Sequence, residues 1–116
     1  MNNLIRAMST RQTEDRESGD LHCNLLVMLK VDGHQWQSGC FCLNWRPSDG
    51  SNGVTSFHIG VKGSSEFEDD IKIDLLTKAF EMMPESIRNR FELIPDSLHS
   101  NNNQSPALLV REIEVS

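Results

Sequence analysis

The sequence predicts an α+β fold in two layers, with an antiparallel sheet of about four strands packed on one or two helices. Three observations support this class. Residues 21–46 and 54–62 alternate apolar and polar side chains with the period of a β-strand, and residues 71–83 repeat apolar side chains with the period of an α-helix. A last apolar run covers residues 107–115. The order β-β-β-α-α-β therefore predicts one sheet whose inner face packs against the helices.

The first part of the chain is predicted to be a flexible arm over residues 1–20, followed by a single α+β domain over residues 21–116. The arm is mostly polar, and only Leu4, Ile5 and Met8 could pack. Chain ends that bury little are usually poorly ordered.

The first two strands are predicted to form a hairpin about Asp32-Gly33. Asp-Gly favours a two-residue type I′ turn, in which both central residues have positive φ and Val31 pairs with His34. Six apolar residues alternate up to that turn, namely Leu21, Cys23, Leu25, Val27, Leu29 and Val31.

This register leaves a conflict on the second strand. Trp36 and Phe41 would face opposite sides, because an odd separation places two side chains on opposite faces of a sheet. A bulge at Ser38-Gly39 would reverse the later alternation. The predicted core face would then be Trp36, Phe41, Leu43 and Trp45. Without the bulge, the second face would also be apolar and would need a covering layer or a partner.

The third strand is predicted over residues 54–62, after a surface loop of turn-forming residues at 47–53. A helix follows, beginning at a capping box of Ser65 and Glu68 or slightly later at Asp69 or Asp70. Its buried face is a stripe at helical spacing, made of Ile71, Leu75, Leu76, Ala79, Phe80 and Met83.

The helix is interrupted at Pro84, because proline cannot continue the helical hydrogen bonding. A second short helix from Pro84 would bury Ile87, Phe91 and Ile94. Residues 95–106 are predicted to be a long mobile loop around Asn101–Asn103. The last strand, over residues 107–115, would then pair beside the first strand in either direction.

Length and charge restrict the function classes. At 116 residues the chain suffices for one domain with a modest core. Its formal net charge of −6 disfavours binding to nucleic acid or to an anionic membrane. No apolar run approaches the roughly 20 residues that span a bilayer, and the polar start is unlike a secretory signal. Three cysteines, without the spacing of a secreted scaffold, favour free thiols in the cytoplasm.

The candidate metal and catalytic residues form no complete motif. Cys23, Cys40 and Cys42 would make a triangle suited to zinc in the unbulged register, but no second ligand pair follows at finger-like spacing. We therefore predict no metal, no cofactor and three free, mostly buried thiols. Cys40 or Cys42 could act as a nucleophile with His58 as base only if the second and third strands pair suitably. No catalytic motif supports that arrangement, so the sequence favours a protein that is not an enzyme.

The most uneven charge lies at the start of the predicted helix. It comprises Glu66, Glu68, Asp69, Asp70 and Asp74. One interpretation is a solvated helix start, whose acids suit the helix dipole. The other is a contact surface that steers a basic partner. Trp36 and Trp45 are further candidate contact residues, because tryptophan is enriched at binding hot spots, although a small core is expected to bury at least one.

Together these features predict a small, acidic, non-catalytic protein-binding module of the cytoplasm. Inhibitors and immunity or anti-defence proteins that occupy a partner's surface have this general profile. One alternative is a small-molecule-binding or catalytic domain that uses cysteine or histidine in a pocket between sheet and helix. A second alternative is a structural homodimer formed through the free sheet edge or the second sheet face.

Overall fold

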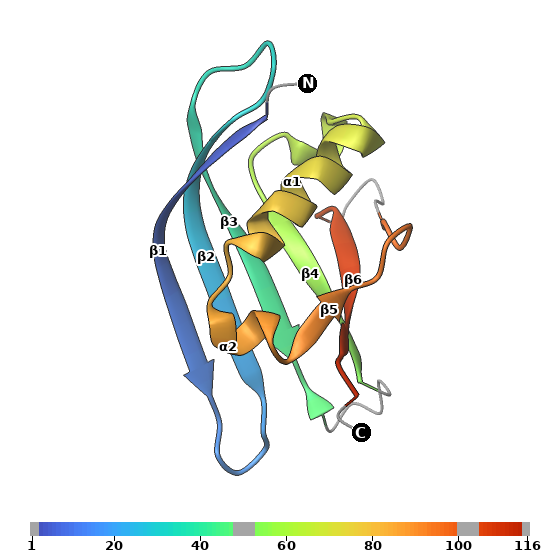
Figure 1. Cartoon of the computed structure of the whole chain (residues 1–116). Coiled ribbons are helices and arrows are strands. Elements are labelled where there is room, and N and C mark those ends of the chain that lie inside the picture. Colours follow the sequence, from blue (N-terminus) through green and yellow to red (C-terminus); the bar gives the residue numbers. More distant parts are fainter. Residues whose placement is uncertain (1–2, 48–52, 100–104, 115–116) are drawn as a thin grey trace.

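The computed structural model describes residues 3–47, 53–99 and 105–114. Within these ranges one antiparallel sheet contains β1 (Leu4–Glu14), β2 (Leu21–Lys30), β3 (Gln37–Trp45), β4 (Val54–Gly60), β5 (Phe91–Leu93) and β6 (Ala107–Glu112). The helical segments whose bounds fall within these ranges are the 3₁₀ turn η2 (Ser64–Glu66), α1 (Asp69–Glu81) and α2 (Glu85–Arg88). The strand order is β1-β2-β3-β4-β6-β5, and the sheet curls as a half-barrel around α1 (Figure 1).

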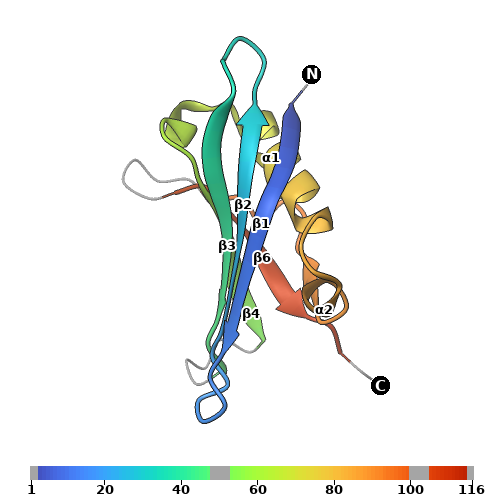
Figure 2. The same cartoon turned by 90° about the vertical axis from the view of Figure 1, so that its left-hand side faces the viewer.

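The helices α1 and α2 lie on the same side of β1, β2 and β3, as the side view shows (Figure 2). We call this side of the sheet the inner face and the opposite side the outer face. The predicted α+β class, with an antiparallel sheet packed on a helix, is therefore confirmed. The predicted number of about four strands is wrong, because β1 and β5 bring the sheet to six strands.

The strand β1 lies where the sequence predicted a flexible arm. It pairs with β2 along its whole length, from Leu4–Lys30 to Glu14–Leu21, with a register shift between Ala7 and Ser9. All of its residues except Ile5 are exposed. A strand that buries so little lacks the apolar alternation by which half-buried strands are recognised, which explains the wrong expectation.

The turn between β2 and β3 is not the predicted type I′ turn. Gly33 has a φ of +82°, whereas Asp32 is not among the residues with positive φ. The backbone N–H of His34 donates to the carbonyl of Val31 at 2.9 Å. A positive φ at the second central residue alone is the pattern of a type II turn. Strand pairing begins only at Leu29–Gln37, so the connection is longer than a two-residue hairpin loop.

The pairing of β2 with β3 is continuous and lacks the predicted bulge at Ser38-Gly39. The longer turn shifts the register by one residue instead, which brings Phe41, Leu43 and Trp45 into the core as predicted. Without a bulge, Trp36 remains an odd number of residues from Phe41, so its side chain is not on the core side. Trp36 is 47% exposed, and its predicted place on the core face is wrong.

The core joins the inner face of the sheet to α1. The ring of Phe57 stacks on Phe41 with centroids 5.9 Å apart and meets Phe80 edge-on at 5.7 Å. The third strand and the helical stripe were predicted from alternation and spacing, and their apolar residues are buried, except that Val54 and Ile71 are only partly buried. These residues are Phe57, Ile59, Val61, Leu75, Leu76, Ala79, Phe80 and Met83.

The start of α1 differs from the predicted capping box. Ser65 lies in η2, and the N-cap residue of α1 is Glu68, without a side-chain hydrogen bond to the helix. The N-cap acid therefore makes no capping bond, although the carboxylate of Asp70 accepts a hydrogen bond from the backbone N–H of Ile71 in the first turn.

The end of the chain pairs differently from the expectation. β6 lies between β4 and β5 and is antiparallel to both, because β1 already occupies the free side of β2. Ile87 is buried from α2, but Phe91 begins β5 rather than continuing the helix. Residues 48–52 and 100–104, which include most of one predicted loop and Asn101–Asn103 of the other, lie outside the described residues.

Candidate functional site

The acids at the start of α1 lie on the surface, as predicted. Glu66, Glu68, Asp69 and Asp70 are all exposed. Asp69 is the one with a basic neighbour, since the Nζ of the buried Lys72 lies 3.5 Å from its carboxylate. The other three form no ion pair within the described part of the chain. Asp70 does accept a hydrogen bond from the backbone N–H of Ile71 at 2.9 Å, but the exposed charges of the three acids have no ionic partner and therefore contribute little to folding.

Asp74 belongs to a different arrangement. It accepts a hydrogen bond from the side-chain amide of Asn3 at 2.8 Å and pairs with Lys78 at 2.9 Å. Burial alone would raise the pKa of Asp74, but these hydrogen bonds and the Lys78 charge hold that pKa below its ordinary value. Lys78 also donates to the backbone carbonyl of Asn3 at 2.9 Å. Asp74 thus fastens the start of β1 to α1, which sets it apart from the other acids.

The two tryptophans separate into one exposed and one buried side chain. Trp36 is 47% exposed, whereas Trp45 is 4% exposed and packs edge-on against Phe91 with centroids 5.7 Å apart. Trp45 is therefore a core residue, and Trp36 is the tryptophan that a partner could contact.

Trp36 and the acids lie at the same end of the molecule. The ring of His34, two residues before Trp36, meets the buried ring of Phe67 edge-on at 5.7 Å, and Phe67 lies between Glu66 and Glu68. The β2–β3 connection and the start of α1 are both at the upper end in Figure 1. We define the end surface by its exposed members, which are Trp36, Glu66, Glu68, Asp69 and Asp70.

The three cysteines do not form the triangle that the unbulged register would give. Cys23 pairs with Leu43 and points into the core, where it is fully buried, while Cys40 and Cys42 lie on the outer face and are only partly buried. Their two Sγ atoms are 3.7 Å apart. The one-residue shift of register separates Cys23 from the other two, so the triangle that the unbulged register would give does not form. The prediction that most of the thiols are buried is wrong, because only Cys23 is fully buried.

Cys42 lies directly opposite His58 on the outer face, the arrangement that a catalytic pair would need. The electrostatics oppose that use. Burial and the adjacent Cys40 raise the pKa of Cys42 to about 12, whereas a catalytic thiol is activated by a lowered pKa. Burial also lowers the pKa of His58, whose Nε2 lies 2.6 Å from the hydroxyl of Ser56 rather than being bonded to a thiol. The pair is thus a protonated thiol beside a neutral imidazole.

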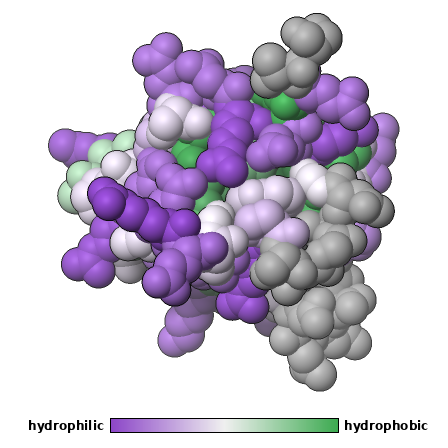
Figure 3. Space-filling view, turned by 90° about the horizontal axis from the view of Figure 1, so that it is seen from below, coloured by the Kyte–Doolittle hydropathy of each residue, from purple (hydrophilic) through white to green (hydrophobic). Residues whose placement is uncertain are grey.

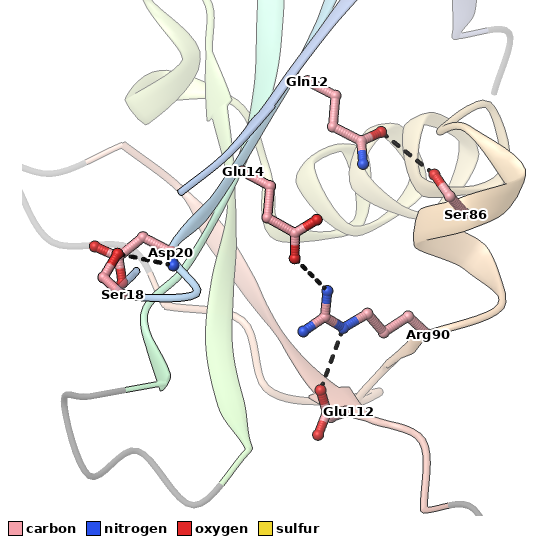
Figure 4. Close-up of polar contacts among 7 residues, drawn as sticks. All are labelled: Gln12, Glu14, Ser18, Asp20, Ser86, Arg90 and Glu112. Atoms are coloured by element: carbon pink, nitrogen blue, oxygen red, sulfur yellow. Dashed lines mark hydrogen bonds and ion pairs between the residues drawn. The ribbon is translucent and has the colours of Figure 1, made fainter. Parts of the chain in front are cut away.

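A cavity of about 670 Å³ opens near the lower end of the molecule, beside β6 and α2. Its cations are already paired, because Arg90 bonds Glu14 and Glu112, and Arg111 bonds Glu92. No cysteine or histidine lines it. The described surface at this end is mainly hydrophilic (Figure 3), and Figure 4 shows the Arg90 contacts. The cavity therefore lacks the features of the predicted alternative, a pocket with cysteine or histidine.

The residues that the sequence analysis missed are those of β1. Arg6 and Arg11 pair with Met28 and Asn24, so both side chains lie on the outer face. The available signal was weak, namely that residues 4–14 contain no glycine, proline, asparagine or aspartate.

Two further properties concern the described residues as a whole. They contain no group of three or more His, Cys, Asp or Glu side chains that could hold a metal ion. None of their helices is long and apolar enough to cross a membrane. Comparison with protein-family models, with curated proteins and with solved structures finds no match to the chain.

Proposed function

We propose that this protein is a non-catalytic protein-binding module that occupies a basic surface of its partner through the end surface. The observation that carries the proposal is the contact of His34 with Phe67, which brings an exposed tryptophan to the same end as four exposed carboxylates. Tryptophan supplies a large apolar contact, and clustered charges of one sign speed encounter with an oppositely charged surface.

This combination suits an inhibitor or an immunity-type protein. Such a protein needs to bind and block, without transforming a substrate. The raised pKa of Cys42 and the paired cations of the lower cavity disfavour the catalytic alternative. Three of the four acids make no ion pair among the described residues, so a partner can engage their charges without breaking an ion pair of the fold.

Charge reversal tests the proposal. The variant Glu66→Lys, Glu68→Lys, Asp70→Lys leaves Asp69 and its pair with Lys72 in place. A matched control reverses three exposed acids away from the end surface, Glu17, Glu81 and Glu85. Both variants change the net charge by the same amount, so a difference between them reports the position of the charges.

Partners are captured from a lysate of the source cells and identified by mass spectrometry, and association is then measured by surface-binding kinetics. We expect the first variant to associate more slowly than the control at low salt. The difference should shrink as the Debye length falls from about 10 Å at 0.1 M to about 3 Å at 1 M. Equal association rates of the two variants at low salt would contradict the proposal.

The tryptophan is tested separately. Trp36→Ala should act mainly on dissociation, and a hot-spot loss of about 2 kcal/mol corresponds to roughly a 30-fold weaker complex. An unchanged affinity would remove Trp36 from the contact surface and leave only the acids.

A further inference from the structure

The free edge of β1 is the second surface that the fold leaves unused. Among the described residues β1 pairs with β2 alone, so the backbone groups along its other side have no strand partner. β1 is 11 residues long, whereas β5 at the opposite edge has three. Figure 2 looks onto β1, and the strand lies in front of the other elements. A long, exposed edge of this kind is a template for one more strand.

The edge is held in place at both ends. At its start, Asn3 bonds Asp74 at 2.8 Å and accepts a hydrogen bond from Lys78 at 2.9 Å. At its far end, Glu14 pairs with Arg90 at 3.3 Å, and Ser86 donates to Gln12 at 3.3 Å (Figure 4). A strand that is ordered in advance binds with a smaller loss of conformational entropy.

The charge of the outer face selects the partner. Arg6, Arg11 and Lys30 lie on it, and none of the three forms an ion pair within the ranges that the structure describes. The register places no aspartate or glutamate at the outer positions of β1, β2, β3 or β4, although the chain has a net charge of −6. Side chains directly opposite each other on adjacent strands interact, so an added strand would place its outer side chains beside Arg6 and Arg11.

From these observations we propose that the β1 edge binds an extended acidic segment of a partner protein as an additional strand. Arg6 and Arg11 pair with residues four apart in β2, Met28 and Asn24. A strand that pairs with the free edge of β1 in the same way would have residues four apart beside Arg6 and Arg11, so we expect acids at that spacing in the bound segment. A second copy of β1 is a poorer occupant, because it would bring arginines of both copies to one edge. This surface is independent of the end surface, so either proposal can fail alone.

The alternative is that the register shift and the arginines only protect the edge from unwanted pairing. The binding proposal and this protective role are distinguished by offering the β1 edge a strand to pair with. A nine-residue segment, TVEVTVEVT, is fused to the N-terminus of the full chain through a short Gly-Ser linker, which gives an effective concentration in the millimolar range. The matched control fusion carries TVKVTVKVT. Hydrogen exchange of the β1 amides is then compared among both fusions and the unfused protein.

We expect the acidic fusion to slow exchange of β1 amides at least tenfold relative to the unfused protein, and the lysine fusion to leave it unchanged. In the variant Arg6→Glu, Arg11→Glu the preference should reverse, with protection by the lysine segment. Both arginines are exposed, so this variant should keep the fold, which exchange of the β2 and β3 amides monitors. Equal protection by both segments, or by neither, would overturn the proposal. Concentration-dependent protection in the unfused protein would overturn it in favour of a second copy.

Discussion

A methyl group at Gly39 tests the register in which β2 pairs with β3. Gly39 lies opposite Val27 in the continuous pairing of β2 with β3. A Cβ at this position would lie 2.5 Å from Cγ2 of Val61 and 3.3 Å from Cδ2 of Leu29. Both neighbours are buried, so neither can swing out into solvent. Gly39→Ala should therefore push Val61, the residue that follows β4, away from β3.

Two effects of opposite sign compete in this substitution. Replacing glycine in a strand stabilises by about 0.5–1 kcal/mol through backbone entropy, while overpacking a well-packed core costs about 1–3 kcal/mol. The 2.5 Å approach is well inside van der Waals contact, so we expect the cost to dominate. A net loss of about 1–2 kcal/mol lowers the urea midpoint by roughly 1 M, given slopes of about 1–3 kcal/mol/M for small proteins.

Urea unfolding followed by circular dichroism measures this loss, with two comparisons. Gly60→Ala is the matched control, because its Cβ would meet Cys40 Sγ at 3.0 Å on the partly open outer face, and it should cost less. Val61→Ala removes the clashing methyl, so the double variant should recover part of the loss, with a coupling of about 1 kcal/mol or more. Gly39→Ala as stable as the unmodified protein would refute the reasoning, and a bulge at Ser38-Gly39 would then be restored as an explanation.

Two further predictions follow from the pKa shifts on the outer face. Burial lowers the pKa of His58 below its ordinary value of 6.5. As the pH falls below 6.5, His58 therefore takes up a proton more readily in the unfolded chain than in the folded protein, and the free energy of unfolding should fall between pH 7 and pH 5. His58→Gln should flatten that fall in urea titrations at the two pH values, and an equally steep fall in the variant would count against the shift. Because the pKa of Cys42 is raised to about 12, iodoacetamide at pH 8 should alkylate Cys42 far more slowly in the folded protein than in urea. Peptide mass spectrometry gives both rates, and equal rates would contradict the raised pKa.

The elements predicted correctly are those whose burial imposes a period on the sequence. The alternation from Leu21 to Leu29 marks β2 because one of its faces is the core, and the stripe of α1 is visible for the same reason. The register of β3 was harder. Asp-Gly favours a tight turn locally, but that turn would place Phe41 and Trp45 outside, and burying them gains more than a turn type does.

Only part of the candidate site could be predicted from the sequence. Clustered acids are visible in the sequence itself, and their exposure follows from their charge. Their proximity to Trp36 depends on the contact between His34 and Phe67, which no local pattern encodes. The choice between Trp36 and Trp45 as the buried tryptophan followed from the one-residue shift in the turn, and the sequence offered a bulge as an equally good solution.

The error about β1 has a physical cause that bears on function. Burial is what gives a strand its periodic signature, and β1 buries almost nothing of its own. It is ordered by its backbone pairing with β2 and by polar contacts at its ends, such as Asn3 with Asp74 and Glu14 with Arg90. Exposed side chains and an unpaired edge are also what an incoming strand requires. The low burial of β1 is therefore the reason that the sequence pattern did not predict it, and the same low burial leaves its edge open to an incoming strand.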